Sequence, residues 1–71
     1  MEEKLRELIL EYLAAGGFKS LGEINQFCSI EFPDVKHHAL YLKMHAVVLN
    51  LIDENLIEQK EIENHLWVKG K

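Results

Sequence analysis

The chain has 71 residues, a net charge of −4, one cysteine, and 48% hydrophobic and 28% charged residues. This length suits one small domain near the lower limit for a core without disulfides or metal, and one cysteine cannot form an internal disulfide. The acidic balance gives no overall positive field to attract nucleic acid, and no apolar run approaches the roughly 20 residues that cross a bilayer. We therefore expect a single folded domain over residues 1–71 in the cytoplasm, with no membrane partner.

Two helices are predicted in the first part of the chain. Leucine, isoleucine and tyrosine residues recur at helical spacing over roughly 2–15, and Gly16-Gly17 offers the left-handed conformation that ends a helix. Ser20 and Glu23 have the spacing of a capping box, which predicts the start of a second helix. That helix should be short and end near residues 29–31, because Pro33 disfavours helical geometry in the residue before it.

A third helix is predicted between Val35 and Glu54. We expect Asp34 to cap its first turn, and we expect Asn55 to take the left-handed conformation at its end. After it come two strand-like runs, residues 56–62 and 65–69, with Glu63-Asn64 as a tight turn between them. Trp67 is expected to anchor this β-hairpin in the core.

Apolar residues cover most of the predicted third helix. One face carries Val35, Ala39, Leu42, Ala46 and Leu49, and roughly opposite lies a second face of Leu40, Met44, Val47 and Leu51. Only a narrow stripe is polar, made of Lys36, Lys43 and Asn50. An ordinary surface helix buries one apolar face, so a chain of this length has difficulty covering both.

Three helices followed by a hairpin, with Asn55-Leu56-Ile57-Glu58 at the junction and Leu66-Trp67-Val68-Lys69-Gly70 at the end, resemble the winged-helix family over the whole chain. This resemblance implies an α+β fold with a two-stranded wing. A narrower likeness, to the small winged-helix dissimilatory sulfite reductase D proteins, is carried by Phe32-Pro33-Asp34-Val35-Lys36, by the same closing run and by Met1-Glu2-Glu3. Helix three is about one turn too long for that narrower pattern. That family implies a protein partner.

The winged-helix resemblance implies double-stranded DNA as the partner, bound by a transcriptional regulator that we expect to act as a dimer. In such proteins the third helix enters the major groove and the wing contacts the backbone. Carried onto this chain, the contacts are Lys36, His37, Tyr41 and Lys43 on the helix and Lys60 and Lys69 on the wing. The only arginine is Arg6, so the commonest bidentate reader of guanine is absent from this set, and these lysines could instead solvate an exposed face.

The alternative is a protein-interaction module or small regulatory subunit. Its interface would be Leu40, Met44, Val47 and Leu51, whose spacings of four, three and four are those of helix–helix packing. If this face is exposed, a homodimer is the simplest explanation. The alternative explanation is that helix one and the hairpin cover it. Burial of Met44 and Val47 within one chain decides between these.

Catalytic and cofactor-binding patterns are not apparent, so we expect neither an enzyme nor a cofactor. Cys28 has no neighbouring group that would activate it, and no glycine-rich loop follows a strand. Four histidines raise the question of a metal site, but His38 and His45 share a helix face about 10 Å apart, too far to hold one ion. We expect no metal.

Overall fold

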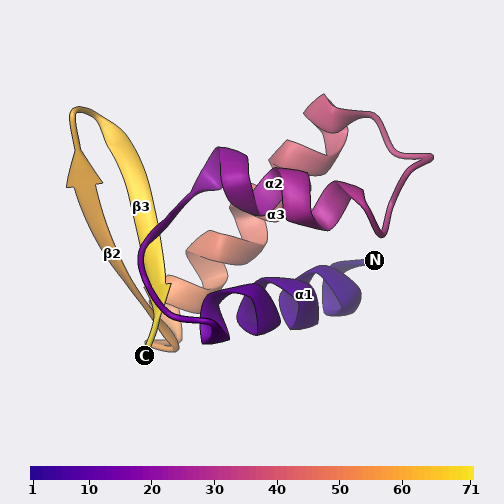
Figure 1. The fold of residues 1–71 in the computed structure, drawn as a ribbon. Coiled ribbons are helices and arrows are strands. Elements are labelled where there is room, and N and C mark those ends of the chain that lie inside the picture. The colour runs from indigo at the N-terminus through magenta and orange to yellow at the C-terminus, as the bar shows by residue number, and fades with distance from the viewer.

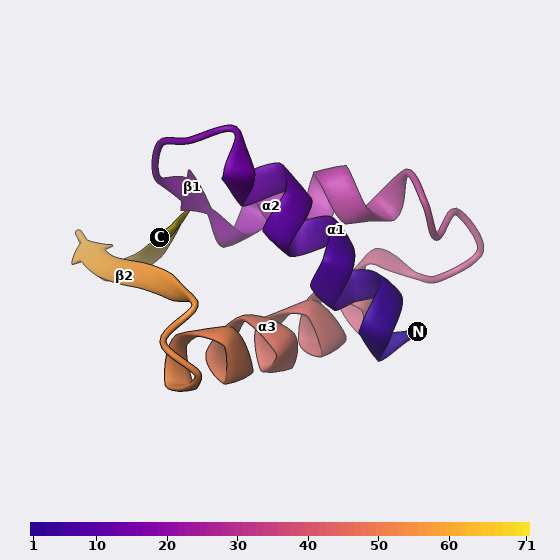
Figure 2. The same cartoon turned by 90° about the horizontal axis from the view of Figure 1, so that it is seen from below.

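The computed structural model describes residues 1–71 as three helices and three strands (Figure 1). The elements are α1 (Glu2–Ala14), β1 (Lys19–Ser20), α2 (Leu21–Ser29), α3 (His37–Asp53), β2 (Ile57–Ile62) and β3 (His65–Gly70). The sheet stands beside the helices, near the C-terminal end of α3. In Figure 2, α1 and α2 lie on one side of α3, and no helix or strand lies against its other side. The architecture is α+β with a C-terminal β-hairpin.

The strands form one antiparallel sheet in the order β1-β3-β2. β2 and β3 pair along their whole length, and the turn residues Glu63 and Asn64 have φ values of 50° and 68°. Two consecutive residues with positive φ are typical of the tight turns that join twisted strands. The predicted hairpin and its turn are confirmed. The strand β1 was not predicted, because its two residues are too few to leave a periodic pattern.

The start of α2 follows the predicted capping box. The Ser20 hydroxyl accepts a hydrogen bond from the Glu23 N–H at 3.2 Å, and a Glu23 carboxylate oxygen accepts one from the Ser20 N–H at 3.4 Å. These bonds satisfy two backbone donors that a helix start leaves free. The start of α3 differs from the prediction: Lys36 occupies the N-cap position without a side-chain cap, and Asp34 lies in the preceding turn.

The end of α3 is a Schellman motif. Asn55 has a φ of 64°, its N–H donates to the Ile52 carbonyl at 2.9 Å, and the Leu56 N–H donates to the Leu51 carbonyl at 3.0 Å. Asparagine tolerates this left-handed conformation better than most residues. The predicted end of helix three is confirmed.

The core lies between the three helices and the inner face of the sheet. It is made by one face of each helix together with two strand residues: Leu5, Leu8, Ile9, Leu13, Leu21, Ile24, Cys28, Leu40, Met44, Val47, Val48, Leu51, Ile57 and Val68. Successive strand residues face opposite sides of a sheet, so burial of Val68 turns Trp67 outward. Trp67 is half-buried opposite Lys60 and Ser20, and the prediction that it anchors the hairpin in the core is wrong.

Candidate functional site

The face of α3 that the sequence offered as a partner interface is part of the core. Leu40, Met44 and Leu51 are 0% exposed and Val47 is 6% exposed, because α1, α2 and β2 pack on this face. The assignment of these four residues to a partner interface is therefore wrong. The fold buries this face because it carries more apolar surface. Together with Val48 it presents five large side chains, and burying them removes more apolar area from water than burial of the opposite face would.

The opposite face of α3 is exposed and also apolar. We call its line of residues the outer stripe, made of Ala39, Leu42, Ala46 and Leu49, all of which are exposed. Leu42 is 57% exposed and Leu49 is 48% exposed. The spacings of three, four and three residues keep the stripe on one side of the helix. The exposure of these residues agrees with Figure 2, in which no other helix or strand lies on the side of α3 that is turned away from α1 and α2.

Asp53 continues the line of the outer stripe to the end of α3. It is eleven residues beyond Leu42, which places it about 20° from that leucine around the helix. Asp53 is exposed, and the single salt bridge of the structure involves other residues. The outer stripe therefore ends in a carboxylate that has no cation bound to it.

The charges at the two ends of α3 are opposite to those that its dipole favours. Lys36 lies at its N-terminal end, where the first turn has no acidic residue, while Asp53 and Glu54 lie at its C-terminal end, where the last turn has no basic residue. A helix favours anions near its N-terminus and cations near its C-terminus. Within one chain, α3 leaves this mismatch largely uncompensated.

Arg6 compensates part of the mismatch at the C-terminal end. Its two terminal nitrogens donate to the two carboxylate oxygens of Glu54 at 2.9 and 2.6 Å. These hydrogen bonds lower the pKa of Glu54 below its ordinary value and raise that of Arg6. The pair ties α1 to the end of α3, so the only arginine has a structural contact and is not on the hairpin or the outer stripe.

The predicted DNA contacts on α3 fall on different flanks. Lys36 and Lys43, seven residues apart, share one flank, and Asn50 on the same flank lies beside Glu2 and Arg6 of α1. Tyr41 lies about 160° around the helix from Lys43 and faces the hairpin side. Lys36 and Lys43 therefore lie on the flank of α3 that leads to the acidic start of α1, and Tyr41 lies on the other flank.

The remaining predicted DNA contacts lie in two separate places, at the start of α3 and on the outer side of the sheet. His37 is exposed at the start of α3, and its carbonyl accepts a hydrogen bond from the Asn25 amide at 3.5 Å. The Lys60 and Lys69 amines lie 4.1 and 5.7 Å from the centre of the Phe18 ring, on the outer side of the sheet. The structure brings this pair together, but it does not gather all six predicted residues on one surface.

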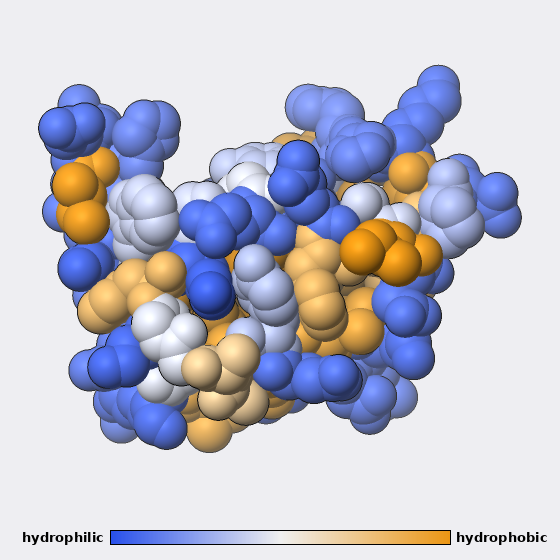
Figure 3. All heavy atoms as spheres, in the orientation of Figure 1, coloured by the Kyte–Doolittle hydropathy of each residue, from blue (hydrophilic) through white to orange (hydrophobic).

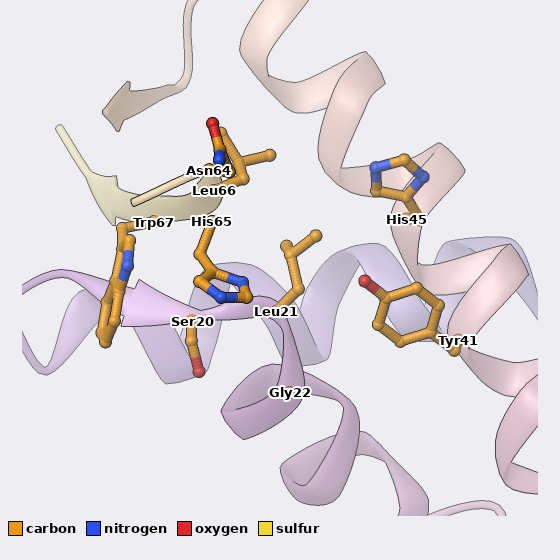
Figure 4. Close-up of a pocket in the computed structure, with 9 residues that line it drawn as sticks. All are labelled: Ser20, Leu21, Gly22, Tyr41, His45, Asn64, His65, Leu66 and Trp67. Atoms are coloured by element: carbon orange, nitrogen blue, oxygen red, sulfur yellow. The ribbon is translucent and has the colours of Figure 1, made fainter. Parts of the chain in front are cut away.

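A groove of about 420 Å³ separates the hairpin from α3 and the start of α2. We call it the hairpin groove, and Figure 3 shows a hollow between the sheet and the helices. Figure 4 shows Tyr41 and His45 on the α3 side and His65 on the hairpin side. The lining residues are Ser20, Leu21, Gly22, Tyr41, His45, Asn64, His65, Leu66 and Trp67. They offer hydrogen-bonding groups and no carboxylate. Of these, the sequence interpretation had singled out only Tyr41 as a contact.

The only thiol of the chain is shielded. Cys28 is 0% exposed, and burial raises its pKa to about 11, so it is protonated at neutral pH. No three histidine, cysteine, aspartate or glutamate side chains lie close enough together to hold a metal ion. None of the helices has the length and apolar character needed to cross a membrane.

Comparison of the chain with protein-family models, with curated proteins and with solved structures found no match.

Proposed function

We propose that the chain is a protein-interaction module that binds an apolar helical surface through the outer stripe of α3. The observation that carries this proposal is the exposure of Leu42 and Leu49 on the free side of that helix. Burial of apolar surface by a partner is favourable by roughly 25 cal/mol per Å². The spacing of three and four residues is that of helix–helix packing, and Ala39 and Ala46 leave room for a partner backbone to come close.

The arrangement of the elements supports a winged-helix assignment, with the β2–β3 hairpin as the wing and α3 as the third helix. In DNA-binding members of that fold the third helix meets the duplex. Here the centre of its free side carries leucine and alanine in place of hydrogen-bond donors. Apolar side chains on the side of the third helix that would meet DNA favour a protein partner over a nucleic acid.

Duplex DNA binding is the second candidate. It is favoured by burial of Met44 and Val47 within one chain, as the DNA interpretation requires, and by a hairpin groove without carboxylates. Three observations weigh against it: the net charge of −4, the absence of arginine from the candidate surface, and the separation of Lys43 from Lys60 and Lys69. The interaction module is therefore the first candidate.

The test removes the apolar character of the outer stripe without adding charge. The tagged chain, its Leu42→Gln and Leu49→Gln double variant and an Ile30→Gln control are used to capture proteins from an extract of the source cells. Ile30 is 75% exposed and lies next to Tyr12 and Phe27, away from the stripe. Quantitative mass spectrometry should find proteins held equally by the wild type and the control and lost by the double variant. Equal capture by all three would contradict the proposal.

The same three proteins test the DNA candidate. Fluorescence anisotropy with random-sequence duplex DNA at about 50 mM salt should show no binding if the interaction module is correct. A DNA-binding function instead requires affinity that falls with salt, with a log–log slope of about −0.9 for each phosphate contacted. Binding of that kind, retained in the double variant, would make DNA the first candidate.

A further inference from the structure

We propose that the occupant of the outer stripe is a second copy of this chain, with the two α3 helices packed antiparallel. This inference rests on the proposed interaction function and names its partner. It is carried by two features of α3: the apolar pattern of the stripe and the charges at the two ends of the helix.

The stripe is complementary to itself when the second helix runs in the opposite direction. A two-fold axis between positions 45 and 46 places Leu42 of each copy opposite Leu49 of the other. The two-fold symmetry forms this Leu42–Leu49 contact twice in the dimer. Each contact shields from water two leucines that are 57% and 48% exposed in the single chain. The small side chains of Ala39 and Ala46 allow the axes to approach toward the short end of the usual 8–10 Å range.

The end charges select the antiparallel orientation. In that arrangement Asp53 of one copy lies opposite position 38 and close to Lys36 of the other, so the cationic end of each helix meets an anionic end. A parallel arrangement would instead bring like charges together. The antiparallel pair also opposes the two helix dipoles and places compensating charge at the mismatched ends of both. Asp53, which has no salt bridge within the chain, gains a cationic neighbour.

The size of the contact sets the concentration at which pairing is expected. One helix face from each copy is a small interface, and small interfaces belong to weak or transient complexes. We therefore expect dissociation in the micromolar range or above, where dilution separates the copies.

Sedimentation velocity between about 10 μM and 1 mM tests self-association. The wild type and the Ile30→Gln control should shift from monomer to dimer over this range, while the Leu42→Gln and Leu49→Gln double variant should stay monomeric and folded by circular dichroism. A wild type that stays monomeric throughout overturns the dimer. If stripe-dependent capture from extract persists in that case, only the identity of the partner is wrong; if it is also absent, the interaction function fails as well.

Disulfide formation tests the orientation. Leu42→Cys and Leu49→Cys are prepared separately, one of them labelled with ¹⁵N, and are oxidised alone and as a mixture. Cys28 is 0% exposed and does not interfere. Antiparallel packing predicts covalent heterodimers in the mixture and few in either protein alone. Positions 42 and 49 are about 10.5 Å apart along a helix, and a disulfide joins Cα atoms about 4.4–6.8 Å apart. Efficient cross-linking of each variant with itself would overturn the antiparallel arrangement.

Discussion

Leu42 and Met44 are two residues apart on α3, yet the leucine is 57% exposed and the methionine is 0% exposed. Side chains two residues apart point to nearly opposite sides of a helix, so the two residues report on different faces. Met44 contributes to folding, whereas Leu42 is free to contribute to binding. This division is the residue-level basis of the proposed function.

We predict that Met44→Ala lowers the free energy of unfolding by about 2–5 kcal/mol, because it removes buried atoms and leaves a cavity. The matched change Leu42→Ala should alter it by less than about 0.5 kcal/mol, since an exposed position away from such features has little effect. Urea unfolding followed by circular dichroism measures both, at a low micromolar concentration chosen to disfavour dimer formation. Equal losses for the two variants would contradict the assignment of inner and outer faces.

At the scale of the element, the sequence predicted those features that rest on local chemistry. The Ser20–Glu23 capping box, the left-handed Asn55 and the tight turn at Glu63-Asn64 all depend on a few neighbouring residues, and all are confirmed. The strand β1 depends on pairing with a segment nearly fifty positions away, and so has no local signal. The predicted cap at Asp34 is wrong, because residues 33–35 form a turn and α3 starts only after Lys36.

The choice between the two faces of α3 could not be made from periodicity, because both faces satisfy the helical pattern. The size of the side chains held the missing information. The buried face has no alanine, whereas two of the four residues of the outer stripe are alanine. Burial of the larger side chains removes more apolar area from water, so this comparison would have favoured the face that the structure buries.

At position 53 the helix dipole and the proposed dimer favour opposite charges: the dipole favours a cation, and the dimer favours the anion that is present. Asp53→Lys should raise the stability of the monomer by about 0.3–1 kcal/mol, because a cation suits a helix C-terminus. The same change should weaken dimerisation, because it places a second cation against Lys36 of the other copy. Sedimentation velocity and urea unfolding measure the two effects.

Glu11→Lys is the matched control for this charge reversal, since Glu11 is exposed on α1, which packs on the side of α3 away from the outer stripe. It changes the net charge equally and should leave the dimer unchanged. Adding Lys36→Glu to Asp53→Lys should restore dimerisation. Equal weakening by the Glu11 and Asp53 variants would show that net charge alone is responsible, and would argue against the antiparallel contact.

At the scale of the whole molecule, the chain presents two distinct surfaces. The hairpin groove gathers histidine, tyrosine, serine and asparagine side chains, and the outer stripe offers leucine and alanine. The sequence placed a candidate interface on the third helix, on the face that the structure buries in the core. The groove joins residues from positions 20 to 67, and only the tertiary fold brings these together.

Nuclear magnetic resonance of the ¹⁵N-labelled chain, followed over a dilution series from about 1 mM to 10 μM, tests the central claim most directly. It reports each amide separately and so identifies the surface that is covered. Concentration-dependent shifts should be confined to the outer side of α3, around Leu42, Ala46 and Leu49, with the hairpin groove unchanged. Spectra that are independent of concentration, or shifts centred on Tyr41 and His65, would contradict the claim that two copies meet through the outer stripe.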